Sequence, residues 1–225
     1  MDVQNIYVAV WNARGLNNPA RRSAVRIEVD DAQASVVCVS ESKLQSVTQF
    51  DIAQWFGARF DGFVYVPAVG SAGGVLVAWR SEDVRVLASR VDRFSVSIHI
   101  VKGDGAAWWL TTVYGPTCDS LKDEFLNELR MLRAAIVGPW AVTGRRFTWS
   151  NSRAEPTLVK LDRWFASVDW EELHPDVSLS ALTSSISDHC PILMSTAVAS
   201  HFGKRFRFER FWLKLEGFMD TAKVL

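Results

Sequence analysis

Polar residues adjoin three short apolar segments of this 225-residue sequence, and their side chains are of the kinds that bind metals and phosphates. Asn12 and Glu41 each follow an apolar run, whereas Asp188 and His189 precede one. Because strand ends converge on one rim of a sheet, two carboxylates, an amide and an imidazole could gather there. Mg²⁺ prefers one or two carboxylates together with substrate oxygens. The pattern therefore predicts a site for a divalent cation and a phosphate.

Each of these residues has a plainer interpretation when it is taken alone. A glutamate after a strand is usually a solvated turn residue, and an asparagine there is a common turn former. An Asp-His pair before a strand usually forms a local hydrogen-bonded turn. Their joint occurrence at three segment ends favours the site only moderately. Whether the residues can meet depends on the strands and helices that carry them.

Short apolar runs rich in valine and isoleucine predict a protein built mainly on strands. Val36–Val39 is continuously apolar, which predicts burial on both faces, whereas Phe94–Ile100 alternates, which predicts one wet face. The expected strands are Ile6–Trp11, Val36–Ser40, Phe63–Val66, Gly74–Trp79, Val84–Ala88, Phe94–Val101 and Trp108–Tyr114.

Two helices are expected between the strand groups, one from Pro19 to about Ala32 and one over Ser120–Ile136. The second has one apolar stripe, and Ser120 with Asp123 resembles a capping box at its start. The stripe consists of Leu121, Phe125, Leu129, Leu132 and Ile136. More strands than helices indicate an α/β fold in which helices cover a β-sandwich.

The composition suits one globular domain, because 48% of the residues are hydrophobic. The 25 basic and 25 acidic residues cancel, which argues against a protein that coats nucleic acid but leaves room for a local basic groove. Three cysteines without metal-ligand spacing suggest reduced thiols in an intracellular protein. The N-terminal residues predict neither a signal peptide nor a membrane span.

Composition changes after about Ala199, so we expect a domain over residues 1–198 and a basic, aromatic tail over 199–225. The stretch "HFGKRFRFERFWLKLEGF" carries five basic residues against two acids. Arg205 and Arg207 in it are candidates for contacts with nucleic acid. The plainer interpretation is a linker, or the start of a lost downstream domain.

Eight motifs occur in the order found in the endonuclease/exonuclease/phosphatase superfamily, and the sequence resembles that family over nearly its whole length. It is most similar to the endonuclease domains of plant non-LTR (LINE-type) retroelements, in which a segment like the tail leads to a reverse transcriptase. The motifs are "WNARGL" (11–16), "SESK" (40–43), "GGVLVAW" (73–79), "TVYGP" (112–116), "GPW" (138–140), "RRFTWSN" (145–151), "KLDRWFAS" (160–167) and "SDHCPI" (187–192).

This resemblance implies a four-layered α/β sandwich of the DNase I-like type, with the active site on one rim. It implies a role in metal binding for Glu41, with Asp188 near the metal, and Mg²⁺ as the cation, with Mn²⁺ as the alternative. It further implies that Asn12 and Tyr114 contact the phosphate. His189 would stabilise the reacting phosphate. Negative charge builds up on the phosphoryl oxygens during hydrolysis, and an imidazolium placed there lowers the barrier, as do a cation and neutral donors. Asp162 would orient His189.

One motif of the family is missing. Relatives carry Gly-Asp-Phe-Asn after the strand that begins "PW", followed by a few dozen residues before "GRRFTWSN". Here "PWAV" passes directly into "TGRRFTWSN", which indicates an internal deletion. With only Thr143 and Gly144 between the two parts, we expect a fold that is incomplete around residues 140–150, with an abnormal hairpin or a lost strand. Asp119 and Glu155 are the remaining carboxylates that could substitute.

The missing aspartate is the residue that activates water in relatives, and losing a general base costs about 10²–10⁴ in rate. The predicted function is thus a Mg²⁺-dependent DNA endonuclease fold with absent or strongly reduced activity. The alternatives are a non-catalytic remnant that binds nucleic acid or a partner, and a phosphatase for small phosphoesters. DNA is the expected partner, with no membrane and no obligate protein partner. A DNA substrate would place the protein in the nucleus, although no basic import cluster signals it.

Overall fold

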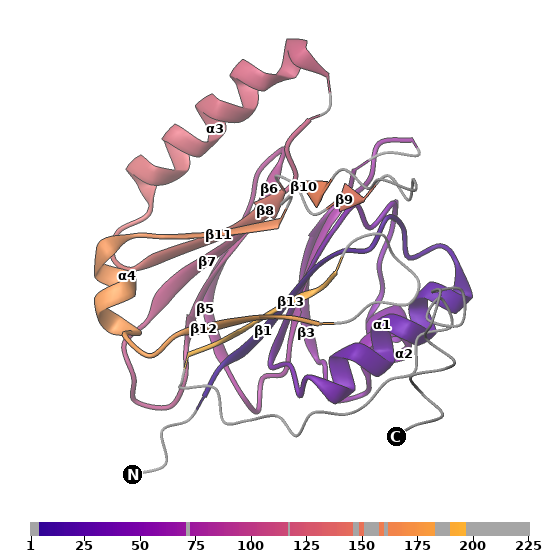
Figure 1. Ribbon diagram of the computed structural model, residues 1–225, viewed down its shortest axis with the longest axis horizontal. Helices are drawn as coiled ribbons and strands as arrows, with labels where there is room; N and C mark the ends of the chain where they lie inside the picture. The colour runs from indigo at the N-terminus through magenta and orange to yellow at the C-terminus, as the bar shows by residue number, and fades with distance from the viewer. Residues whose placement is uncertain are drawn as a thin grey trace, which may run out of the picture.

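The computed structural model describes residues 5–70, 73–116, 118–145, 149–150, 158–159, 162–182 and 190–196. Its strands form two large sheets and one small ladder (Figure 1). The strands of the first sheet, in spatial order, are β12 (Ser178–Ala181), β13 (Ile192–Ser195), β1 (Tyr7–Asn12), β2 (Val36–Ser40), β4 (Val75–Trp79) and β3 (Gly62–Val66). Those of the second are β11 (Asp162–Ala166), β8 (Trp140–Arg145), β7 (Trp108–Val113), β6 (Ser95–Val101) and β5 (Arg85–Val91).

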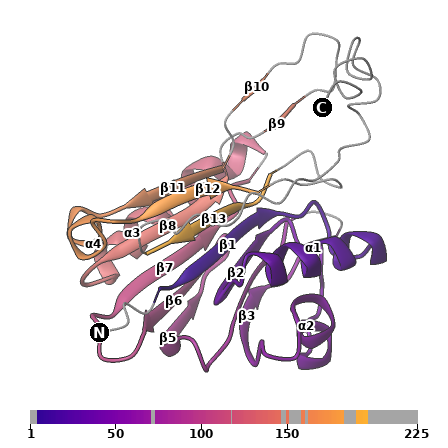
Figure 2. The same ribbon diagram turned by 60° about the horizontal axis from the view of Figure 1, so that its bottom comes forward.

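The two sheets pack face to face, and helices cover their outer faces, which confirms the predicted α/β sandwich. The core between the sheets takes valines from β1, β2 and β4 and isoleucines from β6. Helices α1 (Pro19–Asp31) and α2 (Gln49–Phe56) lie beside the first sheet (Figure 2). Helix α3 (Lys122–Ala135) packs Leu132 against Trp140 of the second sheet. Among the described residues, no helix is long and apolar enough to cross a membrane.

Strand β2 is buried at all five positions, as its continuous apolar run predicts. The prediction of a wet face for Phe94–Ile100 is wrong, because Ser95 and Ser97 are fully buried. Their hydroxyls are hydrogen-bonded there, Ser97 with Thr111 of β7 at 2.8 Å and Ser95 with Glu128 of α3 at 2.6 Å. The alternating polar residues of β6 therefore form a layer that α3 covers, and not a solvent-exposed face.

The predicted capping box at Ser120 is also wrong. A 3₁₀ turn, η1 (Asp119–Leu121), precedes α3, and Leu121 at the helix start makes no side-chain capping bond. The Ser120 hydroxyl instead lies 2.9 Å from the Cys118 sulfur. A capping box is present at α2, where Thr48 and Asp51 cap each other's backbone amides. The short α4 (Val168–Leu173) and α2 itself are helices that the sequence pattern did not indicate.

The segment at the expected deletion forms one continuous strand. β8 runs from Trp140 to Arg145 without a break, parallel to β7 and antiparallel to β11. Thr143 and Gly144 are therefore not a hairpin, and the predicted gap does not interrupt the second sheet. The residues after it enter β9 (Trp149–Ser150), which pairs with β10 (Leu158–Val159) outside the two sheets.

Gly144 explains how β8 can lie so close to β7. A Cβ atom at this position would lie 2.1 Å from Cγ2 of Val113 and 2.9 Å from its carbonyl oxygen. Only glycine leaves room for that approach. The strand that the sequence analysis treated as two joined pieces is thus held by a residue that suits its position.

Candidate phosphodiester site

Asn12 and Glu41 lie at the ends of two neighbouring parallel strands of the first sheet. Asn12 ends β1 and is in register with Ser40, the last residue of β2, so Glu41 is one residue beyond. Only 1% of Asn12 and 8% of Glu41 is exposed to solvent. Parallel strands bring their carboxyl ends to one edge of a sheet, which is the common position of ligand sites in such sheets. The predicted meeting of these two residues is found in the structure.

The backbone around these two residues is bent into the left-handed region. Of the four non-glycine residues with positive φ that the structure describes, three lie here: Arg14 at 49°, Glu41 at 52° and Lys43 at 56°. Residues other than glycine rarely adopt this conformation, and it clusters at functional sites. Backbone hydrogen bonds stabilise it, from Leu16 N to Ser42 O at 2.9 Å and from Lys43 N to Gly73 O at 3.0 Å.

Tyr114 brings the second sheet to the same rim. It follows β7, and its hydroxyl donates a 2.8 Å hydrogen bond to Oε1 of Glu41. The backbone of Tyr114 is itself held by a bond from its N–H to the carbonyl of Phe94 at 2.9 Å. The contact fixes the orientation of the carboxylate, as hydrogen bonds to ligating carboxylates do in metal sites. Asn12, Glu41 and Tyr114 together form what we call the polar rim.

The polar rim suits a divalent cation bound together with a phosphate. Mg²⁺ is commonly held by one or two carboxylates plus substrate oxygens, and Glu41 supplies a nearly buried carboxylate at a strand end. Asn12 is buried beside it, with Oδ1 accepting a hydrogen bond from Arg14 N at 3.2 Å. Among the described residues, no group of three or more His, Cys, Asp or Glu side chains gathers as a protein-only metal cage. The Glu41 carboxylate could supply one ligand to a cation whose other ligands come from a bound substrate.

The backbone of Asp162 starts β11 in register with Arg145, the last residue of β8. Val113 of β7 is in turn in register with Gly144. The ends of β7, β8 and β11 therefore lie at one edge of the second sheet, and Tyr114 joins that edge to Glu41. Asp162 is placed at the level of the rim, as its predicted role requires, and that role stays a prediction.

Asp188, His189, Arg205 and Arg207 lie outside the described residues, so their predicted roles stay predictions. The chain next to the first two is described: β13 begins at Ile192, which is in register with Val10 of β1. Pro191 is buried, and its carbonyl accepts from Leu182 N at 2.7 Å. This register puts the start of β13 at the same edge of the sheet as Asn12.

Of the two carboxylates considered as substitutes, Asp119 is described and Glu155 is not. The side chain of Asp119 is 86% exposed and forms a 2.5 Å ion pair with Lys122 on the next turn. The Lys122 ammonium lowers the pKa of this carboxyl by hydrogen bonding and by its charge. A carboxylate with a lowered pKa is a poorer base, which makes Asp119 a weak substitute.

Two glycines that support the polar rim were not singled out as site residues from the sequence. Gly73 and Gly74 both have positive φ, and a Cβ on Gly74 would lie 2.4 Å from the hydroxyl oxygen of Ser42. The carbonyl of Gly74 accepts from Ser42 N at 3.0 Å, so these glycines support the turn that carries Glu41. The Gly-Gly pair was visible in "GGVLVAW", but its partner was not, because the contact joins residues far apart in sequence.

No family model matches the sequence, and neither does any curated protein. Solved structures do match. The endonuclease domain of TRAS1, a telomere-specific non-LTR retrotransposon, has a TM-score of 0.61 at 11% identity and covers 87% of this chain and 99% of that one. D. rerio TDP2 complexed with a single-strand DNA product has a TM-score of 0.61 at 12% identity, covering 85% and 98%. The AP endonuclease LMAP from Leishmania major gives 0.61 at 14% identity, covering 85% and 87%. These likenesses show the DNase I-like fold.

Proposed function

We propose that this protein binds the phosphodiester backbone of DNA at the polar rim, with Mg²⁺ or Mn²⁺, and hydrolyses it weakly or not at all. The observation that carries the proposal is the convergence of Asn12, Glu41 and Tyr114 from both sheets. The three solved structures support it, since two are described as endonucleases and one as holding a single-strand DNA product. The sequence resemblance to retroelement endonucleases supports a retroelement origin.

The rim accounts for the binding half of this chemistry. Negative charge grows on the phosphoryl oxygens during hydrolysis, and a bound divalent cation would neutralise part of it. Glu41 would hold that cation, and the Tyr114 hydroxyl would keep the carboxylate in place. The Asn12 amide, buried at the end of β1, would contact the phosphate as a neutral group. His189, oriented by Asp162, would add an imidazole donor.

The end of β8 supports the proposal that hydrolysis is weak or absent. In the family that the sequence resembles, an aspartate follows the glycine after this strand. Here β8 ends in Gly144 and Arg145, with Gly144 in register with Val113 and therefore one residue short of Tyr114. A guanidinium is always protonated in proteins and cannot act as a general base. An arginine in that place keeps a charge suited to phosphate and removes the base that would activate water.

A supercoiled-plasmid nicking assay with Mg²⁺ tests the proposal, together with fluorescence anisotropy of labelled DNA. We expect nicking by the unaltered protein to exceed that of Glu41→Gln and His189→Ala by little or nothing. We expect DNA binding that weakens as salt rises, because phosphate contacts release counterions. Strong nicking that both substitutions abolish would overturn the loss of activity. DNA binding that is absent at low salt would overturn the DNA-binding role.

A further inference from the structure

Helix α3 is attached to the second sheet by few side chains. All 14 of its residues are described, and of these only Leu132 is buried, where it packs against Trp140. In the first half of the helix, Phe125 and Glu128 are half-buried. They are three positions apart and therefore lie on the same face of the helix. The first half of α3 thus depends on what these two side chains contact.

Glu128 binds the backbone at the start of β6. Both of its carboxylate oxygens accept from Phe94 N at 3.2 Å, and Oε1 also accepts from the Ser95 hydroxyl at 2.6 Å. Ser95 is fully buried and Phe94 is 8% exposed, so water has little access to either donor. Hydrogen bonds to a carboxylate are shorter and stronger than those to a neutral acceptor. Glu128 therefore fixes the place of the Phe94 backbone.

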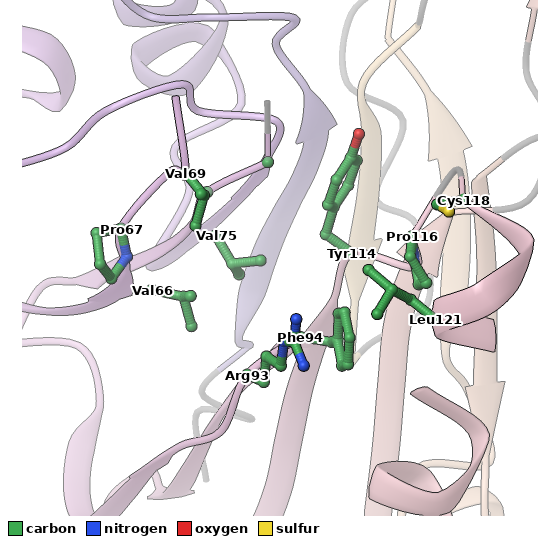
Figure 3. Close-up of a pocket in the computed structure, with 12 residues that line it drawn as sticks. Val66, Pro67, Val69, Val75, Arg93, Phe94, Tyr114, Pro116, Cys118 and Leu121 are labelled. Carbon is green, nitrogen blue, oxygen red and sulfur yellow. The ribbon is translucent and has the colours of Figure 1, made fainter. Parts of the chain in front are cut away.

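The backbone of Phe94 is in turn bonded to Tyr114. The carbonyl oxygen of Phe94 accepts from Tyr114 N at 2.9 Å, and the Tyr114 hydroxyl donates to Oε1 of Glu41 at 2.8 Å. Figure 3 shows Phe94 and Tyr114 on the wall of a cavity of about 430 Å³, with the tyrosine hydroxyl pointing away from Phe94. A continuous line of contacts leads from Glu128 on α3 to the carboxylate of the polar rim.

Phe125 supports the same segment from a second direction. The edge of its ring meets the ring of Phe94, at 5.7 Å between centroids and 84° between planes. Its ring also lies against Gly115, where a Cβ atom would be 3.4 Å from Cε1 of Phe125. Phe94 is the backbone partner of Tyr114, and Gly115 follows Tyr114 in the chain. One face of α3 therefore holds the backbone on both sides of the tyrosine.

We propose that Glu128 is a positioning residue for the polar rim. By fixing the backbone of Phe94, it keeps Tyr114 where the tyrosine hydroxyl orients the Glu41 carboxylate. This inference deepens the proposed function and rests on it, since Glu41 is the proposed ligand of the cation. Glu128 acts through Tyr114 and has no direct part in the chemistry.

The first link, from Glu128 to Tyr114, can be measured without any metal. The chain has three tyrosines, so ¹³C labelling of tyrosine gives a simple ring spectrum. The Tyr114 signal is the one that disappears in Tyr114→Phe. Glu128→Ala should shift or broaden this signal, because the hydroxyl loses its fixed place beside Glu41. The other tyrosine signals should not move, which shows that the variant is folded.

Two further variants of α3 separate this effect from a general loosening of the helix. Glu124→Ala removes a carboxylate one turn earlier, which pairs with Arg93 at the surface, and it should leave the Tyr114 signal unchanged. Glu128→Gln keeps an oxygen that can accept from Phe94 N, so it should restore the signal toward that of the unaltered protein. A Tyr114 signal that does not respond to Glu128→Ala, or that responds equally to Glu124→Ala, would overturn the inference.

The second link, from Tyr114 to the cation, is measured by Mn²⁺ titration followed by water proton relaxation. Glu128→Ala should weaken Mn²⁺ binding by up to about tenfold, the low end of the loss that follows removal of an outer partner of a metal ligand. In a Tyr114→Phe background the same substitution should change the affinity little, because a double-mutant cycle reports the coupling between the two residues. Equal losses in both backgrounds would show that Glu128 does not act through the Tyr114 hydroxyl.

Failure of the proposed function would give a different result. If the unaltered protein binds no Mn²⁺, the rim does not hold a cation, whereas a Tyr114 signal that responds to Glu128→Ala still supports the positioning of Tyr114. If Mn²⁺ binds and Glu41→Gln abolishes it, but the Tyr114 signal ignores Glu128, this inference alone is overturned.

Discussion

Each sheet contributes one pair of parallel strands to the rim, and the two pairs end in different chemistry. In the first sheet, β1 and β2 end at Asn12 and lead to Glu41, an amide and a carboxylate. In the second, β7 leads to Tyr114, which carries a hydroxyl, and β8 ends at Arg145, an arginine. The hydrogen bond from Tyr114 to Glu41 joins the two pairs.

This difference separates two tasks that a nuclease usually performs together. The groups that we propose to hold a cation and a phosphate lie mainly on the first pair, whereas activation of water would need a carboxylate at the end of the second. Since the pairs belong to different sheets, a change at β8 can remove one task and leave the other. Adding a carboxylate at the end of β8 tests whether water activation can be restored. Removing groups from the first pair tests whether they bind the cation.

Arg145→Asp should have the largest effect. It places a carboxylate at the end of β8, and a positioned general base contributes about 10²–10⁴ in rate. We expect a gain in Mg²⁺-dependent plasmid nicking within that range. The matched control is Arg145→Asn, which removes the positive charge without adding a base. An equal gain in both variants would mean that the arginine charge, and not the missing base, limits hydrolysis.

Glu41→Gln should abolish binding of the divalent cation, and Tyr114→Phe should weaken it. Removing a group that orients a metal ligand costs about 10–100-fold in affinity, and the ligand itself costs more. Mn²⁺ titration followed by water proton relaxation measures both variants. If Tyr114→Phe binds Mn²⁺ as tightly as the unaltered protein, the hydroxyl does not position the carboxylate.

Gly144→Ala should destabilise the fold without touching the first strand pair. The added methyl group would lie 2.1 Å from a side-chain carbon of Val113. Overpacking of this kind costs about 1–3 kcal/mol of unfolding free energy. Urea denaturation measures the loss, and Gly115→Ala is the control, since its Cβ would meet Phe125 at an ordinary 3.4 Å. Equal stability of both variants would show that β7 and β8 do not need this close approach.

His174 should give the smallest effect, at the end of the second sheet away from the rim. Burial lowers its pKa below the ordinary value of 6.5, and its ring packs against Trp108 and Trp170. The folded state therefore prefers neutral His174, and stability falls as pH drops below about 6.5 and the unfolded chain takes up the proton first.

The matched variant is His174→Phe, which keeps a ring without a titratable group. Its unfolding free energy should depend less steeply on pH in this range. The difference in slope is below about 1.4 kcal/mol per pH unit, the limit for one proton, because the ring is only partly buried. Chemical denaturation across the range measures it, and identical slopes would exclude His174 as the source.

Much of the sheet structure could be predicted, because strands such as β2 and β7 are short apolar runs with a clear period. The alternating pattern of β6 led to the wrong prediction of a solvent-exposed face. In a sequence, serines that form hydrogen bonds with Thr111 and Glu128 cannot be told from surface residues. Helix α2 was missed for lack of a long apolar stripe, although its cap at Thr48 and Asp51 was present. Local patterns report which residues are polar, but not which long-range partner covers them.

The site could be predicted as far as its residues follow strand ends. Asn12 and Glu41 were expected together because strand ends converge on one rim of a sheet, and the parallel pairing of β1 and β2 brings them together. Tyr114 needed the family resemblance, since its bond to Glu41 spans 73 residues of sequence. The end of β8 was misjudged, because the register that sets Gly144 against Val113 is a property of the folded sheet.

The left-handed residues Arg14, Glu41 and Lys43 have a consequence for how the rim responds to ligands. Each such residue costs about 1–3 kcal/mol of conformational strain, which the surrounding fold must overcome. The backbone that carries the carboxylate therefore loses its freedom when the chain folds, and a ligand does not have to order it afterwards. If the rim binds a phosphate as proposed, it would do so as a preorganised site that favours ligands matching its charge and shape.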